Sequence, residues 1–169
     1  MRQEYRGENL DFDDSRTLID NEFKNGFFDE KLDIKIYDYM IIHRFGYSII
    51  HEKISNLNLD HDLTSGLISA IISVSKELFD EGKGIKILDF GDKKIIIETG
   101  ENIILGVITE FITNDLKKYL KKLINYIEEK FGDLIGTWEG NITEMEPVTA
   151  VIHNALIPFL IESIKLDTF

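Results

Sequence analysis

Residues 60–79 read DHDLTSGLISAIISVSKELF and predict the helix around which the rest of the chain is arranged. One apolar stripe recurs at helical spacing, and three further apolar residues widen it to about half of the helix circumference. The stripe consists of Leu63, Leu67, Ile71, Val74 and Leu78, and the residues that widen it are Ile68, Ile72 and Phe79. Because this arc is wider than one contact with a sheet requires, we expect the helix to make a second contact.

The same helix also carries a set of small side chains, which allow another backbone to approach closely. These small residues are Gly66 and Ala70 together with the row Ser65, Ser69 and Ser73. A large apolar surface that the fold itself does not cover marks an interface. The residues that we predict to contact a protein partner are Leu63, Leu67, Ser69 and Ile71.

Composition limits the class of protein. The chain has 169 residues, is 43% apolar and has a net charge of -12, which suits a single domain with a core of its own. The negative charge argues against nucleic acid as a partner, since nucleic acid is a polyanion. There is no cysteine, and no run approaches the length of about 18 apolar residues that a membrane span needs. The start, MRQEYRGENLDFDD, has no apolar core and is not a secretory signal, so we expect a soluble, cytoplasmic protein.

The chain divides into an acidic leader, residues 1–33, and a domain over residues 34–169. The leader is expected to be partly disordered, because it cannot bury enough apolar surface to offset the entropy of ordering. Within it, residues 15–28 contain apolar positions that suit a short amphipathic helix. We keep two interpretations of this helix: it lies on the surface of the domain, or it is a detachable lid over the partner site.

A β-hairpin precedes the central helix. The segment 34–54 reads IKIYDYMIIHRFGYSIIHEKI and predicts strands near 35–43 and 47–54, with Gly46 supplying the positive φ of the turn. Its apolar run at Met40, Ile41 and Ile42 is typical of a strand covered on both faces. Asp60 or Asp62 is expected to cap the central helix that follows.

Three short strands and two helices follow the central helix. Glycines separate strands at 85–90, 93–99 and 103–109, which predicts an antiparallel meander. Thr113 or Asn114 is expected to cap a second helix that Gly132 closes. Trp138 is expected in a loop against the edge of the core. A last helix is predicted to begin at Pro147 and to be interrupted by Pro158.

The predicted fold is therefore α+β, a five-stranded antiparallel sheet in the order β-β-α-β-β-β-α-α, with helices packed on it. Over residues 36–164 this order resembles the longin-like domains with their profilin-like layering, including archaeal relatives of vesicle-trafficking and GTPase-regulating subunits. The resemblance is carried by YMIIHRFGYSIIHEKI, LTSGLISAIISVSKELF, IKILDFGDKKIIIETGENIIL and NDLKKYLKKLINYIEEKFGDL with the following Trp138. It implies a non-enzymatic interaction domain that forms homodimers or heterodimers or binds a small GTPase or a trafficking-type partner.

The nearest alternative is the roadblock fold, which has the same sheet order but a leading helix and usually no second trailing helix. The segment 147–164 favours the longin-like assignment. PAS-like and GAF-like sensors also place helices on an antiparallel sheet. They keep open a second function, in which a small ligand binds in a pocket between sheet and helices lined by Phe45, Tyr47, Phe90 and Trp138.

No catalytic or cofactor motif is present in the sequence. The histidines at positions 43, 51, 61 and 153 lack the spacing of a zinc motif, and His43 and His51 are not expected to lie opposite each other in the hairpin. Phosphate-binding loops and nucleophile elbows are also missing. We expect neither an enzyme nor a bound metal or cofactor.

One basic cluster stands out in this acidic chain, and it consists of Lys117, Lys118, Lys121 and Lys122. The simplest interpretation is a solvated helix face. The functional interpretation is a dock for an acidic partner or a membrane surface. Four lysines at about 1 kcal/mol each give at most weak peripheral membrane contact.

Overall fold

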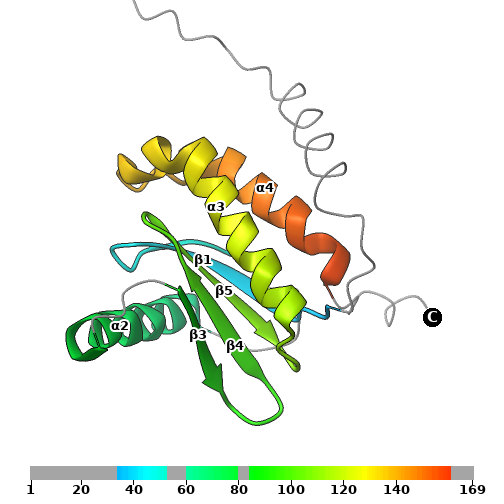
Figure 1. Cartoon of the computed structure of the whole chain (residues 1–169). Coiled ribbons are helices and arrows are strands. Elements are labelled where there is room, and N and C mark those ends of the chain that lie inside the picture. The colour runs from blue at the N-terminus through cyan, green and yellow to red at the C-terminus, as the bar shows by residue number, and fades with distance from the viewer. Residues whose placement is uncertain (1–33, 53–59, 80–83, 161–169) are drawn as a thin grey trace, which may run out of the picture. The chain divides into compact units, whose positions relative to one another are not determined.

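The computed structural model describes residues 34–52, 60–79 and 84–160, and it confirms the predicted α+β fold. Figure 1 shows the arrangement of the strands and helices. The strands are β1 (Asp38–His43), β2 (Ser48–Glu52), β3 (Gly84–Asp89), β4 (Lys94–Thr99) and β5 (Ile103–Thr109). The helices are α2 (His61–Phe79), α3 (Asn114–Gly136) and α4 (Glu146–Leu156), with 3-10 turns at Ile142–Met145 and Ile157–Phe159. The predicted leader, residues 1–33, lies outside the described residues.

The five strands form one sheet in the order β2-β1-β5-β4-β3, and every neighbouring pair is antiparallel. β1 and β5 lie in the middle, where Ile42 pairs with Ile104, and every residue of both strands is buried. This explains why the β1 sequence is apolar without alternation. The turn between β1 and β2 uses Gly46 at φ 92°, as predicted from the sequence.

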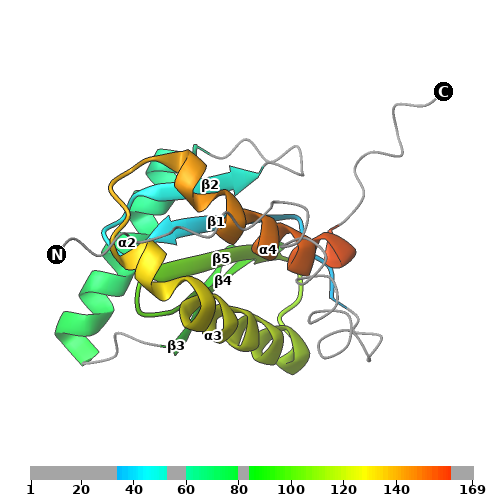
Figure 2. The same cartoon turned by 90° about the horizontal axis from the view of Figure 1, so that it is seen from above.

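Helices cover both faces of the sheet (Figures 1 and 2). On one face, α2 packs Ile68 and Ile72 onto a cluster of strand residues. Those strand residues are Met40, Ile42, Ile95, Ile97, Ile104 and Ile108. On the other face, α3 and α4 lie side by side, and the Tyr119 hydroxyl of α3 donates to the Ala155 carbonyl oxygen of α4 at 2.7 Å. Because strand residues alternate between faces, the isoleucine-rich strands supply two apolar layers at once.

The ends of the helices follow local chemistry. The Asp60 carboxylate accepts from the Leu63 amide at 2.9 Å, and the Thr113 hydroxyl accepts from the Leu116 amide at 3.1 Å, so both predicted caps form. α4 ends at Leu156, and a 3-10 turn containing Pro158 follows it, as expected of a proline that cannot continue the helix.

The predicted end of α3 at Gly132 is wrong. The helix continues for another turn to Gly136, where the Thr137 amide donates to the Asp133 carbonyl oxygen at 3.2 Å. Ile135 in this last turn is fully buried, so apolar packing sustains the helix past the glycine. Within the described part of the chain, no helix has the length and apolar character needed to cross a membrane.

Candidate functional site

The outer flank of α2 carries a row of exposed aliphatic side chains, which we call the α2 stripe: Leu63, Leu67, Val74 and Leu78. Leu63 is 74% exposed and Leu67 is 48% exposed. The sheet-facing side of the same helix is different, since Ile68 and Ile72 are buried there. The sequence-based inference of two contact sides is consistent with this arrangement: one side is covered by the sheet, and the fold leaves the other uncovered.

The four predicted partner contacts do not all lie on this stripe. Leu63 and Leu67 are part of it, and Ile71 is half-buried at its border. Ser69 instead faces the turn between β1 and β2, where a Cβ atom added at Gly46 would lie 3.2 Å from its hydroxyl oxygen. That oxygen is buried and has no hydrogen-bond partner among the described residues. The small side chain of Ser69 therefore allows close approach of the chain's own hairpin.

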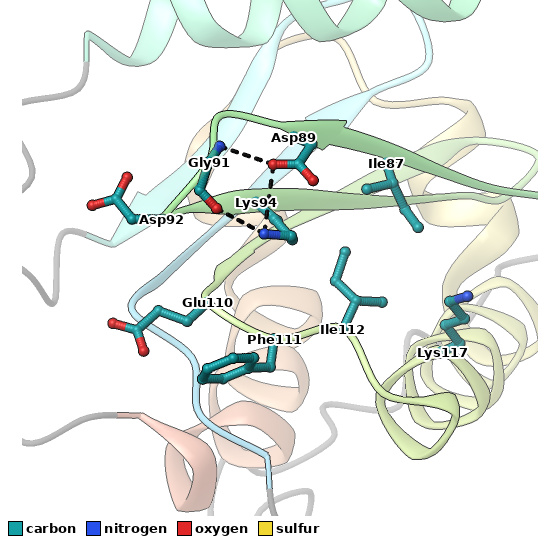
Figure 3. A pocket seen from close by; sticks show the side chains of 9 residues that line it. All are labelled: Ile87, Asp89, Gly91, Asp92, Lys94, Glu110, Phe111, Ile112 and Lys117. Carbon is teal, nitrogen blue, oxygen red and sulfur yellow. Dashed lines mark hydrogen bonds and ion pairs between the residues drawn. The ribbon is translucent and has the colours of Figure 1, made fainter.

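The lysine cluster lies along the first half of α3. Lys118, Lys121 and Lys122 are exposed, and Lys117 is half-buried. Lys117 lines a hollow of about 740 Å³ between the N-terminal end of α3 and the β3–β4 turn. The apolar side chains of Ile87 and Ile112 also line this hollow (Figure 3).

Both acidic and basic groups line that hollow. The Lys94 ammonium group donates to the Gly91 carbonyl oxygen at 2.8 Å and lies 3.5 Å from the Asp89 carboxylate (Figure 3). Asp92 and Glu110 add two further carboxylates to its lining. The hollow therefore does not favour anions over cations, in spite of its position beside the lysine cluster.

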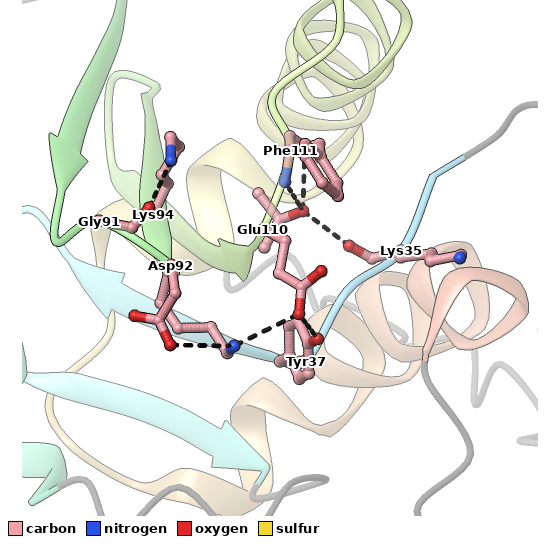
Figure 4. Close-up of polar contacts among 9 residues, drawn as sticks. Lys35, Tyr37, Gly91, Asp92, Lys94, Glu110 and Phe111 are labelled. Atoms are coloured by element: carbon pink, nitrogen blue, oxygen red, sulfur yellow. Dashed lines mark hydrogen bonds and ion pairs between the residues drawn. The ribbon is translucent and has the colours of Figure 1, made fainter.

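Beside this hollow, a polar cluster joins the start of the domain to β5 (Figure 4). The Tyr37 hydroxyl donates to the Glu110 carboxylate, and Lys93 lies 3.4 Å from the same oxygen and 4.3 Å from the centre of the Tyr37 ring. The hydrogen bond from Tyr37, more than the charge of Lys93, lowers the pKa of Glu110. Nearby, the Thr109 hydroxyl donates to the Lys35 carbonyl oxygen at 2.7 Å. These contacts hold the segment before β1 against the sheet.

A second hollow, of about 440 Å³, lies at the other end of the sheet, and we call it the aromatic hollow. It is lined by His43, Phe45, Tyr47, Ser48, Trp138, Glu139, Gly140 and Ile142. The β1–β2 turn contributes Phe45 and Tyr47, and the loop after α3 contributes Trp138. Three of the four aromatic residues predicted to line a pocket thus lie together, with His43 as a further ring that the sequence did not single out.

The fourth residue, Phe90, is not part of this hollow, so that part of the prediction is wrong. The antiparallel registers place Gly84 opposite Thr99, and His43 opposite Ile103, at one end of the sheet. Phe90 follows the last residue of β3 and therefore lies at the opposite end. The hollow also lies where the strands end, between the β1–β2 turn and the loop after α3, and not in the layer between sheet and helices where the sequence placed it.

Hydrogen bonds fix the ring nitrogens in the aromatic hollow. His43 Nε2 lies 3.1 Å from the Ile135 carbonyl oxygen, and the Phe45 amide donates to Nδ1 at 3.4 Å. Since a carbonyl oxygen only accepts, Nε2 carries the proton. The indole N–H of Trp138 donates to the Asn141 carbonyl oxygen at 2.7 Å. Burial lowers the pKa of His43, so its imidazole is neutral at pH 7.

No group of three or more metal-ligating side chains occurs among the described residues. In the β1–β2 ladder His51 pairs with Met40, so His43 and His51 do not lie opposite each other, as predicted. His153 lies on α4, where its Nδ1 is 3.0 Å from the Tyr39 hydroxyl oxygen.

No protein-family model and no curated protein sequence matches the chain. Among solved structures, the fold is similar to Myxococcus xanthus MglB, with 14% identity, a TM-score of 0.50, and coverage of 73% of this chain and 98% of that one. A gliding protein MglB from Thermus thermophilus aligns at 10% identity and TM-score 0.41 over 88% of this chain and 95% of that one. A roadblock/LC7 domain from Streptomyces avermitilis aligns at 14% identity and TM-score 0.45 over 58% and 87%. The first of these likenesses supports the fold.

Proposed function

We propose that the chain is a non-enzymatic protein-interaction domain, formed by residues 34–169, that self-associates through the outer face of α2 and a sheet edge and that binds a small GTPase. The observation that carries the self-association is the α2 stripe. Its four large aliphatic side chains lie on one flank and extend over about 22 Å of helix at 1.5 Å per residue. Burying a fully exposed aliphatic side chain contributes about 1.5–3 kcal/mol. Because these four are between 48% and 74% exposed, each would contribute less, and association entropy offsets part of the gain.

The sheet offers two edges for such a contact. β2 and β3 are the outer strands, and an outer strand has backbone groups that another chain can pair with. An interface that combined the α2 stripe with a strand edge would satisfy apolar and polar groups together, which supports a specific contact.

The class of the partner has a separate basis. The resemblance of the chain to longin-like domains implies a small GTPase or a trafficking-type protein, and the fold likeness to MglB is compatible with it. The lysine cluster on α3 would suit an acidic partner surface. A binding assay with small GTPases from the same organism, loaded with GDP or with a GTP analogue, tests this part. Binding that depends on the nucleotide supports it, and equal absence of binding in both states contradicts it.

Light scattering on the full chain tests the self-association. We expect a dimer that the substitution Leu67→Asp converts to a monomer, because a carboxylate in an apolar interface is costly to desolvate. Lys76→Asp is the matched control: it places the same carboxylate on α2 at an exposed position away from the α2 stripe, nine residues and half a turn from Leu67. A wild-type monomer at all protein concentrations, or equal dissociation by both substitutions, would refute the α2 interface.

A small-ligand sensor is the second candidate, and the aromatic hollow is the observation that favours it. Its volume of about 440 Å³ lies in the range of about 300–1,000 Å³ that is usual for ligand sites.

A further inference from the structure

We propose that the aromatic hollow binds a small quaternary ammonium ion, a ligand class represented by choline. This site is separate from the α2 stripe, since it is built from the β1–β2 turn and the loop after α3. The proposal therefore does not depend on self-association or on a GTPase partner.

The ring geometry provides the first argument. The His43 ring centre lies 5.1 Å from that of Phe45 and 5.6 Å from that of Trp138, and both pairs are tilted by about 50°. The Phe45 and Trp138 rings thus both lie against the same imidazole and line the same hollow. A ring face attracts a cation within about 6 Å of its centre, so a cation bound in this hollow would be attracted by more than one of these rings. Tyr47, which is 66% exposed, adds a third ring at the mouth.

Hydrogen bonding provides the second argument. Both ring nitrogens of His43 and the indole N–H of Trp138 already have partners within the chain. The hollow therefore offers a ligand the faces of these two rings, because their nitrogen atoms already form hydrogen bonds within the chain. A trimethylammonium group has no N–H donor, so it loses no hydrogen bond of its own on entering such a site. An unmethylated ammonium ion would find no acceptor on His43 or Trp138, because Nδ1 of His43 already accepts from the Phe45 amide and the indole N–H only donates.

Charge provides the third argument. Glu139 is among the residues that line the hollow, and the chain as a whole carries a net charge of -12. The imidazole of His43 is neutral at pH 7 because burial lowers its pKa, so it does not repel a cation. Carboxylate and ring faces together favour a positively charged ligand over a neutral or an anionic one.

Arg44 shows how the chain itself uses one of these rings. Its guanidinium group lies 4.8 Å from the centre of the Phe45 ring, and its second contact, to Asn102, is long at 3.5 Å. We expect this side chain to compete weakly with a bound cation at the rim. Removing its charge by Arg44→Gln should leave the affinity for choline unchanged or raise it.

The test uses the full chain and its single tryptophan. Since Trp138 is the only tryptophan, its fluorescence reports on the hollow directly. Choline chloride is titrated at constant ionic strength, and the same titration is made with 3,3-dimethylbutan-1-ol, which has the shape of choline without the charge. We expect a saturable change with choline and at least about tenfold weaker binding of the neutral alcohol, in line with the cation–ring energies.

Variants locate the binding. Tyr47→Ala and Glu139→Gln should each weaken choline binding at least about threefold, because each removes one attractive element. Both residues are exposed, so these variants should keep the fold, and circular dichroism checks that they do. Phe111→Ala is the matched control: it removes an exposed ring from the other hollow, at the opposite end of the sheet, and should change nothing.

Four results would overturn the proposal: no saturable change with choline, equal binding of the neutral alcohol, an equal effect of Phe111→Ala and Tyr47→Ala, or loss of binding in Arg44→Gln. A trimethyllysine peptide that binds at least about tenfold more tightly than choline would overturn the assignment to a small ion. None of these outcomes bears on the oligomeric state, so this site and the proposed α2 interface can fail independently.

Discussion

Glu128 on α3 joins the β4–β5 turn to the helix above it, and its removal should destabilise the whole domain. One carboxylate oxygen accepts from the backbone amides of Asn102 at 2.7 Å and Ile103 at 3.1 Å, and the other accepts from the Asn102 side chain at 2.9 Å. A hydrogen bond to a charged group contributes about 1.5–3 kcal/mol, and a buried donor left without a partner costs about 1–3 kcal/mol.

The size of the effect depends on how much water can replace the carboxylate. Glu128 is half-buried, so we expect water to restore part of the lost bonding. The substitution Glu128→Ala should then lower the free energy of unfolding by about 2–4 kcal/mol. Alanine favours the helix, so helix propensity does not add to this loss. Glu128→Gln keeps one oxygen acceptor and should lose only about 1 kcal/mol.

Urea unfolding followed by circular dichroism measures these differences. Glu129→Ala is the matched control, because Glu129 is the next residue on the same helix and is exposed. We expect its midpoint to stay near that of the wild type, while that of Glu128→Ala falls clearly. If both variants lose the same stability, or if Glu128→Gln is as damaging as Glu128→Ala, the carboxylate does not hold the turn as argued.

Three further predictions concern buried contacts. Glu98 is only 4% exposed, one of its oxygens has no hydrogen-bond partner among the described residues, and burial raises its pKa. Glu98→Gln should therefore stabilise the fold at pH 7. In urea titrations at several pH values this gain should vanish below the ordinary carboxyl pKa, where the folded and the unfolded state both bind the proton. Tyr119→Phe should lower the free energy of unfolding in urea by about 1–2 kcal/mol, because the Ala155 carbonyl oxygen loses its hydrogen-bond donor. An unchanged free energy of unfolding would mean that this hydrogen bond does not contribute to stability. Gly106→Ala should lower the melting temperature, because its Cβ would lie 3.0 Å from Met40 Cγ, and an unchanged value would mean that Met40 moves freely aside.

The sheet and its helices could be predicted because their determinants are local. Isoleucine-rich runs separated by short turns with one glycine each define the strands, and the positive φ of Gly46 follows from its place between two such runs. The wide apolar arc of α2 predicted two contact sides, and the exposed Leu63 and Leu67 are consistent with the second. The prediction that α3 ends at Gly132 was wrong, because helix propensity does not reveal that Ile135 in the next turn is buried.

The sites could be predicted only in part, because they depend on pairs of residues far apart in the chain. Glu128 is 26 residues from Asn102, and nothing in the sequence around either residue indicates that they meet. The grouping of Phe45, Tyr47 and Trp138 was anticipated as a set of aromatic residues. Excluding Phe90 required the strand register, which sequence periodicity does not provide.

The position of β1 next to β5 has a consequence for the rate of folding. β3, β4 and β5 are consecutive and can form as a local meander, and β1 and β2 form a separate hairpin. Joining these two units requires Ile42 to meet Ile104, more than sixty residues away along the chain. The entropy of closing that loop must be overcome before the central pairing stabilises anything, so this step should limit the folding rate. In stopped-flow refolding, substitutions that weaken the β1–β5 contact should slow folding, whereas those confined to the β3 edge should mainly speed unfolding.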